Sequence, residues 1–255
     1  MELRNKVALV IGGSSGIGEA IVGKFASEGA RCAVVASSSL YKARKVAKSA
    51  GRGARPYACD ITKPAEVNKL VAKVLKDFKR IDILVNSAGV FYPTPAGETK
   101  TSDMNRMVDI NLKGTWNIIN AVTPHMRERK RGNIINISSV AGVVALPAYA
   151  LYCGTKAAVV AMTKAMALEL SRDGIHVNTI APGNTASPMN VDIRNDPELA
   201  PVLEFMQSRT PSGKTYSEPE DMANVALFLA SPRTGASIYG SVIVADEGFA
   251  AGVYY

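Results

Sequence analysis

The sequence predicts a single α/β domain, in which about seven parallel strands form a doubly wound sheet with helices on both faces. Short β-branched runs alternate with longer helical patterns, which is typical of β-α-β units joined by right-handed crossovers. Runs such as 7–11 and 134–137 are almost continuously apolar, as expected of strands covered on both faces. The pattern continues from residue 6 to residue 246 without a linker, so residues 1–255 are predicted to form one domain.

The candidate elements follow one another in regular alternation. The strands are the short runs rich in β-branched residues, and they are expected at residues 6–11, 31–36, 54–59, 81–86, 133–138, 176–181 and 241–245. The helices are the longer stretches with helical periodicity, and they are expected near residues 16–29, 40–49, 64–79, 102–128, 150–173 and 219–230.

One long segment departs from this alternation. Residues 182–219 contain six prolines and one short helical patch at 198–207. A long irregular insertion in a compact domain is usually a lid or a binding loop. This segment begins at the carboxyl end of a strand, where α/β sheets place their ligands. We therefore expect a substrate lid near residues 184–215 rather than a disordered surface excursion.

Composition argues against several other classes of protein. Hydrophobic residues make up 47% of the chain and charged residues 20%, as in ordinary globular proteins. The two histidines, His125 and His176, are too few for a three-histidine metal site, and no Cys-x-x-Cys pair occurs, so no metal is expected. No apolar run approaches the ~18 residues of a membrane span or resembles a secretory signal. We expect a cytoplasmic protein without a membrane partner.

The chain carries a net charge of +8 and has a pI of about 9.4. A basic surface attracts nucleic acids, phosphorylated cofactors or acidic partners. The densest cluster of basic residues is formed by Arg127, Arg129, Lys130 and Arg131, and no nucleic-acid-binding motif accompanies it. The sequence therefore predicts no nucleic-acid partner.

A glycine-rich turn lies between the first strand and the first helix. Gly12, Gly16 and Gly18 follow the apolar run at 7–11 with the spacing Gly-x-x-x-Gly-x-Gly. Glycine permits a tight turn and lets the backbone approach a ligand, and the helix N-terminus offers free N–H groups to a pyrophosphate. The alternative is a strand-to-helix turn without a ligand. The position of the motif favours a nucleotide-phosphate site.

A second motif combines a tyrosine, a lysine and a serine. Tyr152 and Lys156 are four residues apart, and Ser139 stands thirteen residues before the tyrosine at the end of an apolar strand. The Tyr-x-x-x-Lys spacing alone is weak evidence, because Tyr41 and Lys45 repeat it. No serine occupies the corresponding position before Tyr41. Only the first combination therefore predicts a catalytic group, against the alternative of an exposed helix pair.

The chemistry explains why these residue types belong together. A phenol has a pKa of ~10, and a lysine ammonium one helical turn away lowers it; three units correspond to ~4 kcal/mol. Tyr152 would then exchange a proton with an alcohol or a ketone, while Ser139 holds the substrate oxygen. A cationic nicotinamide nearby could share the stabilisation. Ser138 is the rival serine, and strand alternation lets only one of the two face the site.

These motifs resemble those of the short-chain dehydrogenase/reductase family, and the resemblance extends to about residue 250. The family has a Rossmann-type fold and a Thr-Gly-x-x-x-Gly-x-Gly cradle, in which Ile11 replaces the threonine here. The segment 86–89, Asn-Ser-Ala-Gly, also matches, although Ser87 stands where the family usually has asparagine. The family's thirteen-residue spacing favours Ser139 over Ser138.

The resemblance also implies roles for individual residues. Asp60 would contact the adenine, Lys156 would hold the nicotinamide ribose, and Asn111 would anchor a water relay to solvent. The loop from Pro182 would lie beside the nicotinamide, with Ser187 in place of a usual threonine. The predicted catalytic residues are Asn111, Ser139, Tyr152 and Lys156. The predicted cofactor-binding residues are Gly12, Ser14, Ser15, Gly16, Ile17, Gly18, Ser37, Ser38, Asp60, Ile61, Asn86, Ala88, Gly89, Tyr152, Lys156, Pro182, Gly183, Thr185 and Ser187.

The choice between the two nicotinamide cofactors depends on the end of the second strand. An acidic residue there would bind a ribose 2′-hydroxyl and repel a 2′-phosphate. The chain instead has Ser37 and Ser38, with Lys42 and Arg44 nearby. This pattern favours NADP(H) and leaves NAD(H) open, because the family's usual basic markers are missing at Ser15 and Ser38.

The leading hypothesis is an oxidoreductase that transfers a hydride between NAD(P) and a secondary alcohol or ketone. Its pocket is expected to be mostly apolar, with the lining Phe91, Tyr92, Val140, Val143, Val144, Leu146, Tyr149, Met189, Phe205 and Met206. One alternative is a 3-oxoacyl-carrier-protein reductase, with Arg129, Lys130, Arg131 and Arg172 as a dock for an acidic carrier. Another is a noncatalytic dinucleotide-binding sensor. Family resemblance also implies a homotetramer, and the small residues on helix 150–173 would allow close packing.

Overall fold

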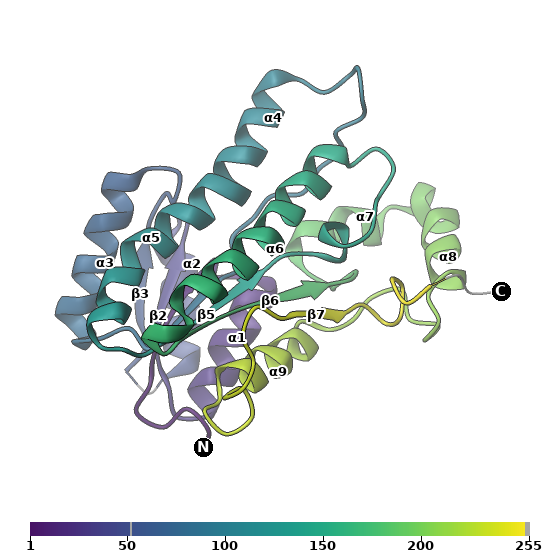
Figure 1. Ribbon diagram of the computed structural model, residues 1–255. Coiled ribbons are helices and arrows are strands. Elements are labelled where there is room, and N and C mark those ends of the chain that lie inside the picture. The colour runs from purple at the N-terminus through teal and green to yellow at the C-terminus, as the bar shows by residue number, and fades with distance from the viewer. Residues whose placement is uncertain (52, 253–255) are drawn as a thin grey trace.

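The computed structural model describes residues 1–51 and 53–252 of the chain. In this part of the protein, seven parallel strands form one sheet in the order β3-β2-β1-β4-β5-β6-β7 (Figure 1). The strands are β1 (Val7–Ile11), β2 (Arg31–Ala36), β3 (Arg55–Ala58), β4 (Ile83–Asn86), β5 (Gly132–Ile137), β6 (Ile175–Pro182) and β7 (Val242–Ala245). The predicted doubly wound sheet is therefore confirmed.

Helices cover both faces of this sheet (Figure 1). Their bounds are α1 (Gly16–Ser27), α2 (Leu40–Ala50), α3 (Pro64–Phe78), α4 (Thr101–Val108), α5 (Thr115–Glu128), α6 (Ala150–Leu170), α7 (Val191–Asn195), α8 (Ala200–Ser208) and α9 (Pro219–Ala230). The side chains of β1 alternate between the two faces. Leu9 packs in a core with residues of α3, α5 and α6, whereas Val10 packs with residues of α1, α2 and α9.

The strand order fixes the position of the site. The chain leaves β1 toward β2 on one side and later returns to pair β4 with β1 on the other side. The connections from the carboxyl ends of these two neighbours therefore diverge, which opens a crevice at that edge of the sheet.

The single helix predicted over 102–128 differs in detail from the structure. It is interrupted by a π-helical segment, Asp109–Gly114, between α4 and α5. Within this segment the Asn111 carbonyl accepts a hydrogen bond from Thr115 Oγ1 at 2.9 Å. Side-chain bonding to the helix backbone and π-bulges both distort regular helices, and such bulges are frequent at functional sites. The interruption therefore draws attention to Asn111.

The amino edge of the sheet is held by a buried carboxylate. Asp82, just before β4, accepts hydrogen bonds from the Val7 nitrogen, Arg80 Nε and an Arg129 terminal nitrogen, each at 2.9 Å. Burial raises the pKa of this carboxyl, but the hydrogen bonds from Val7 and Arg129 and the neighbouring guanidinium charges outweigh it and lower the pKa overall. Asp82 therefore stays ionised and ties three segments together.

The segment predicted as a lid contains short helices. The patch expected at 198–207 corresponds to a 3₁₀ turn, Pro197–Leu199, followed by α8. α8 stands apart from the main body in Figure 1. Among the described residues, none of the helices combines the length and the apolarity that a bilayer crossing would require.

Candidate active site

The glycine-rich turn has a shape that only glycine can adopt comfortably. Gly12 has a φ of +73°, and a Cβ added to it would lie 2.8 Å from the Ala88 nitrogen. A Cβ on Gly18 would lie 2.2 Å from the Gly12 oxygen, and one on Gly16 would lie 3.2 Å from Ser187 Cβ. The turn therefore packs directly against the segment after β4 and faces the segment after β6. The free N–H groups at the start of α1 lie at this turn, and such groups suit a dinucleotide phosphate.

Main-chain hydrogen bonds hold the glycine-rich turn in place, a role that the family's threonine, absent here, would share. The Ser87 nitrogen donates to the Ile11 oxygen at 3.0 Å, and the Gly13 nitrogen donates to the Val35 oxygen at 3.0 Å. The replacement of threonine by Ile11 therefore leaves the turn anchored to both neighbouring strands. Asn86 Nδ2 donates to Asn136 at 2.8 Å, while its buried Oδ1 has no partner among the described residues.

The adenine side of the predicted site lies after β2 and β3. Ser37 and Ser38 are exposed at the end of β2. Asp60 accepts from Thr62 Oγ1 at 2.7 Å, and the Thr62 hydroxyl is the main cause of the lowered pKa of this carboxyl. Ile61 is buried against the helix that contains Gly114, whose added Cβ would lie 2.6 Å from Ile61 Cγ1. The segments after β2 and β3 thus end at the same edge as the glycine turn.

The tyrosine, lysine and serine meet at the start of α6. Tyr152 and Lys156 lie on successive turns and are only 8% and 6% exposed. Lys156 Nζ lies 5.7 Å from the centre of the Tyr152 ring and donates to the Ile137 carbonyl at 3.1 Å. Ser139 follows β5, and its hydroxyl accepts from the Ala141 nitrogen at 3.1 Å and forms a hydrogen bond with the Tyr152 phenol. The three side chains therefore form one cluster.

The pKa shifts in this cluster differ from the sequence-based expectation. Burial raises the pKa of Tyr152 to about 12, and the hydrogen bond with Ser139 lowers it only in part. Burial also lowers the pKa of Lys156 to about 8. The protein's own groups therefore do not acidify the phenol, because desolvation outweighs the hydrogen bond with Ser139. A phenol with this pKa keeps its proton at neutral pH.

The two neighbouring serines have different environments. Ser138 is 3% exposed, and its hydroxyl donates to the Lys156 carbonyl at 2.8 Å. A Cβ on Gly142 would lie 2.8 Å from Ser138 Oγ, so this packing leaves no room for a ligand. Ser139 is the serine on the side of the phenol. Ser138 instead fixes α6 to the end of β5.

Asn111 joins the π-helical segment to the cluster. Its Oδ1 accepts from the Val90 nitrogen at 2.8 Å, and its Nδ2 donates to the Val90 oxygen at 3.0 Å and to Thr155 Oγ1 at 3.3 Å. A Cβ on Gly89 would lie 3.3 Å from Asn111 Oδ1 and 3.5 Å from Lys156 Nζ. The side chain of Asn111 therefore clamps the segment after β4 to α6, next to the lysine.

The predicted loop after β6 closes the other side of the crevice. The Gly183 nitrogen donates to the Ala245 oxygen at 2.9 Å, and a Cβ on Gly183 would lie 2.7 Å from Asp246 Cα. Thr185 is 6% exposed, and Ser187 forms a capping box with Asn190. Arg194, which the sequence did not predict, donates to the Ser187 oxygen and to Asn190 Oδ1, each at 3.2 Å. Nothing in the local sequence singles out this arginine.

Aromatic side chains form one wall next to the phenol. Phe91 stacks on Tyr149 with ring centres 4.6 Å apart and contacts Tyr152 edge-on at 4.8 Å. Tyr92 and Leu146, both predicted to line the pocket, pack in the same cluster. This wall is apolar, so it suits the hydrocarbon part of a substrate.

Other predicted pocket residues are scattered. Val140 is buried in the core, whereas Met189 and Phe205 are 52% and 65% exposed. Val143 and Val144 line a depression of about 430 Å³ whose other lining residues, Val244, Asp246, Ala250 and Ala251, were not predicted. These four come from the end of the described chain and carry no motif, so spacing could not place them beside the loop after β5.

The crevice, the glycine turn and the phenol–serine–lysine cluster define a nucleotide-dependent oxidoreductase. A family model described as enoyl-(acyl carrier protein) reductase matches residues 11–250. The chain is 36% identical over 250 residues to a 3-oxoacyl-acyl-carrier-protein reductase of Thermotoga maritima, covering 97% of this chain and 99% of that one. It is 38% identical over 249 residues to a D-threitol dehydrogenase of Mycolicibacterium smegmatis, covering 97% and 94%.

A solved structure agrees with these sequence matches. A gluconate 5-dehydrogenase from Burkholderia cenocepacia, in complex with NADP and tartrate, superposes with a TM-score of 0.92 at 30% identity, covering 99% of this chain and 98% of that chain. The protein belongs to the short-chain dehydrogenase/reductase family. It is an NAD(P)-dependent oxidoreductase that acts on an alcohol or ketone group, which disfavours a noncatalytic sensor.

Proposed function

We propose that the protein interconverts a secondary alcohol and a ketone through Tyr152, Ser139 and Lys156, with Asn111 as a positioning residue. The observation that carries this proposal is the hydrogen-bonded contact between Ser139 and the Tyr152 phenol beside the buried Lys156 ammonium. A phenol with a pKa of about 12 has its proton at neutral pH and can give it to a carbonyl oxygen.

Each side chain has a distinct part in the reduction of a carbonyl. The nicotinamide, when bound, supplies the hydride. The substrate oxygen accepts hydrogen bonds from the Ser139 hydroxyl and the Tyr152 phenol, and it takes the phenol proton as negative charge develops on it. The Lys156 ammonium stabilises the resulting phenolate. In the opposite direction, the phenolate takes the proton back from the alcohol.

Asn111 acts through other residues. It bonds to Val90 and to Thr155, and Thr155 Oγ1 in turn donates to the Tyr152 carbonyl at 2.9 Å. These contacts fix the first turns of α6, from which both Tyr152 and Lys156 project. The role of Asn111 in a water relay rests on the family resemblance, whereas the positioning role rests on these contacts.

We infer that NADP(H) is the preferred cofactor. The end of β2 exposes Ser37 and Ser38 and offers no carboxylate to repel a 2′-phosphate. The Burkholderia relative is recorded in complex with NADP. Paired kinetics should give a higher kcat/KM with NADPH than with NADH, and Ser38→Asp should reverse the order. A clear preference of the unmodified enzyme for NADH would contradict the inference.

The segment at 184–215 is proposed to be the substrate lid of a single-domain protein. Its base is tied by backbone pairing, because the Ala186 nitrogen donates to Ser217 at 2.9 Å and the Ser217 nitrogen donates to Asn184 at 2.8 Å. Above this base, Met189 and Phe205 expose apolar surface. A segment with a fixed base and an exposed apolar tip suits closure over an apolar substrate.

A small molecule is the better candidate substrate than a carrier-bound one. Two of the four residues that could dock a carrier are already engaged within the chain, because Lys130 pairs with Asp173 and Arg129 pairs with Asp82. The similarity to the Thermotoga reductase still supports the second candidate. Rates with acetoacetyl thioesters and with simple ketones separate the two, since a carrier-dependent enzyme would be fast only with the thioesters.

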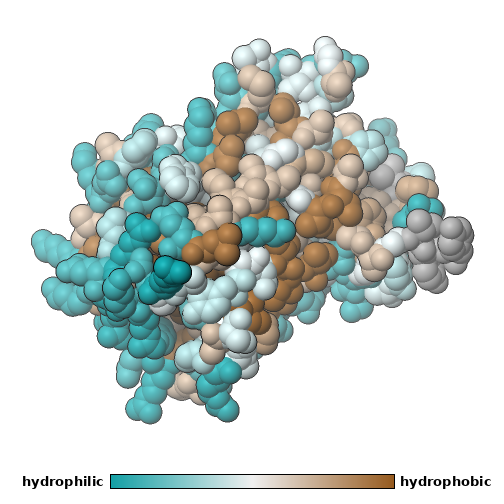
Figure 2. Space-filling model, in the orientation of Figure 1, coloured by the Kyte–Doolittle hydropathy of each residue, from teal (hydrophilic) through white to brown (hydrophobic). Residues whose placement is uncertain are grey.

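A homotetramer remains our proposal for the assembly. Apolar surface runs over the face where α6 lies (Figure 2). Two large apolar side chains of the helices α6 and α5, Leu168 and Trp116, are 83% and 45% exposed. Ala157, Ala161 and Ala165 form a small-residue stripe on the exposed side of the same helix. Sedimentation equilibrium should give four copies, and a monomer at micromolar concentration would contradict this proposal.

The activity itself is tested by a panel of secondary alcohols and ketones with both nicotinamides, followed at the absorbance of the reduced ring. We expect turnover of compounds with an apolar body next to the reacting carbon. Absence of turnover with every ketone and alcohol, in a protein shown to bind NADPH, would contradict the proposed function.

A further inference from the structure

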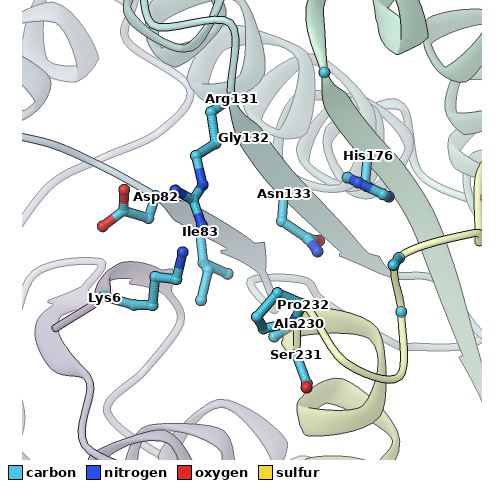
Figure 3. A pocket seen from close by; sticks show the side chains of 13 residues that line it. Lys6, Asp82, Ile83, Arg131, Gly132, Asn133, His176, Ala230, Ser231 and Pro232 are labelled. Atoms are coloured by element: carbon cyan, nitrogen blue, oxygen red, sulfur yellow. The ribbon is translucent and has the colours of Figure 1, made fainter. Parts of the chain in front are cut away.

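A pocket of about 190 Å³ lies at the amino edge of the sheet, opposite the edge that carries the active site (Figure 3). It is smaller than the ~300 Å³ at which pockets for drug-sized ligands begin, so it has room for a small ion and a few waters. The polar side chains that line it are Lys6, Asp82, Arg131, Asn133, His176 and Ser231.

Two cations converge in this pocket without a carboxylate between them. Lys6 directly precedes β1 and Arg131 directly precedes β5, so both lie at the amino edge of the parallel sheet. Figure 3 shows the ammonium and the guanidinium pointing toward one another. Neither side chain forms an ion pair within the described residues. Burial lowers the pKa of Lys6, and the charge of Arg131 is the next cause.

The nearest carboxylate is already occupied. The Asp82 carboxylate points away from the pocket in Figure 3 and is held by Arg80, Arg129 and the Val7 nitrogen. Three guanidinium charges, of Arg80, Arg129 and Arg131, act on Lys6 against the one carboxylate charge of Asp82, so positive charge is in excess around it. A second carboxylate, that of Glu2, accepts from the pocket-lining Ser231 at 2.6 Å and pairs with Arg233.

Two other polar side chains that line the pocket, Asn133 and His176, differ in whether their hydrogen-bonding atoms already have partners. Asn133 Nδ2 donates to the Leu229 carbonyl at 2.7 Å, while its buried Oδ1 has no partner among the described residues. His176 is satisfied on both ring nitrogens, by the Ile238 carbonyl at 3.2 Å and the Tyr239 hydroxyl at 3.1 Å. The pocket thus offers two unpaired cations and one acceptor that lacks a donor.

We propose that this pocket binds a small oxyanion that also carries a hydroxyl group, with Lys6 and Arg131 holding the charge and Asn133 accepting from the hydroxyl. Inorganic phosphate keeps at least one P–OH group at neutral pH, and a phosphate ester of a polyol such as glycerol phosphate carries alcohol hydroxyls beside its anionic group. The site lies across the sheet from the glycine turn, so occupancy by the oxyanion does not compete with the nucleotide.

The test is calorimetric titration of inorganic phosphate into the protein at low ionic strength with saturating NADPH, which fills the phosphate positions of the active site. We expect one bound phosphate, and a Kd about tenfold weaker in Lys6→Gln and in Arg131→Gln, because each removes one charge-assisted hydrogen bond. Arg131 is exposed, so its variant tests the site even if Lys6→Gln folds poorly.

A double variant of exposed lysines, Lys48→Gln with Lys76→Gln, is the matched control for net charge and should bind phosphate as the unmodified protein does. No heat with the unmodified protein, or the same affinity in all variants, would overturn the proposal. A titration with glycerol phosphate in place of inorganic phosphate distinguishes a phosphate ester from the free ion. The ligand with the lower Kd is the better match to the one that the pocket binds.

Sulfate provides a second arm, because it has the charge but no proton to donate at neutral pH. The unmodified protein should bind phosphate several-fold more tightly than sulfate, and Asn133→Leu should lose this preference. Equal affinity for the two ions in the unmodified protein would overturn the assignment of Asn133 and of the hydroxyl.

Discussion

The two edges of the sheet bury charge in opposite ways. At the amino edge, Asp82 is buried among donors and cations, and its pKa falls below the ordinary value. At the carboxyl edge, Lys156 is buried and has no anionic partner among residues 1–51 and 53–252, and burial brings its pKa down to about 8. A partnered charge stays charged over the whole neutral range and holds segments together. An unpartnered one titrates near neutrality, which is useful for proton transfer.

The largest expected effect separates the two serines at the carboxyl edge. Ser139→Ala removes a donor to the substrate oxygen and should lower kcat/KM by about 10²–10³. Ser138→Ala is the control, because within the described part of the chain its hydroxyl bonds only to the Lys156 carbonyl. It should keep activity within about tenfold and lose about 1 kcal/mol of unfolding free energy. Equal losses of activity in both variants would show that the two serines do not differ in role.

The next effect concerns stability at the amino edge. Asp82→Asn should lower the free energy of unfolding by about 2–3 kcal/mol, because charge-assisted bonds to Arg80 and Arg129 are lost. Denaturant unfolding measures this loss, and kcat/KM per folded molecule should not change. If Asp82→Asn kept full stability but had reduced activity, Asp82 would support the reaction rather than the fold, and the proposed contrast between the two edges would be wrong.

The sign of the pH dependence follows from the lowered pKa of Asp82. Its stabilising contribution is complete above the ordinary carboxyl pKa of ~3.9 and is lost as pH falls through the lower folded value. The unmodified protein should therefore lose more stability than Asp82→Asn between about pH 4 and pH 2. Parallel acid-unfolding curves would argue against an ionised, partnered carboxylate.

A smaller, tenfold effect is expected in the pH profile of carbonyl reduction. The Lys156 ammonium stabilises the phenolate formed by proton transfer, and it loses its proton above about pH 8. The kcat/KM should therefore fall by about tenfold per unit above that value. In Lys156→Arg the guanidinium does not titrate, so the fall near pH 8 should vanish even though overall activity is lower. A fall that persists in this variant would assign it to another group.

The smallest effect tests the lid. Phe205→Ser, on α8, should raise the KM of an apolar substrate about threefold, because closure would bury part of this ring. Phe228→Ser on α9 removes a ring of 40% exposure away from the lid and is the control. Unchanged KM in both variants would remove Phe205 from the substrate contact.

Periodicity and glycine spacing were enough to predict the sheet, its strand positions and the edge that carries the site. Apolar runs predict strands because a strand that is buried on both faces needs consecutive apolar residues, and this requirement is visible in the local sequence. The helix over 102–128 was predicted as uniform because its periodicity does not mark the π-helical segment, and the bond of Asn111 to Val90 joins residues that are distant in sequence. The valine and alanines near the end of the described chain were missed for the same reason.

The sequence could not predict the protonation states of the Tyr152–Lys156 pair, because these depend on burial. The spacing of Tyr152 and Lys156 indicates that a cation lies near a phenol, but not how far both are desolvated. In the structure, desolvation raises one pKa and lowers the other, so the pair is a neutral phenol beside an ammonium that titrates near pH 8. The family's spacing already favoured Ser139 over Ser138, and the contact of the Ser138 hydroxyl with the Lys156 carbonyl adds a physical reason.

Single-turnover reduction by Tyr152→Phe is the most direct measurement of the proton-donor role. The substitution removes one hydroxyl and keeps the ring that contacts Phe91. With NADPH binding and thermal unfolding unchanged, we predict that the rate of hydride transfer to a ketone falls by about 10³-fold or more. A rate within tenfold of the unmodified enzyme would contradict the account, because the reaction would then proceed without the phenol proton.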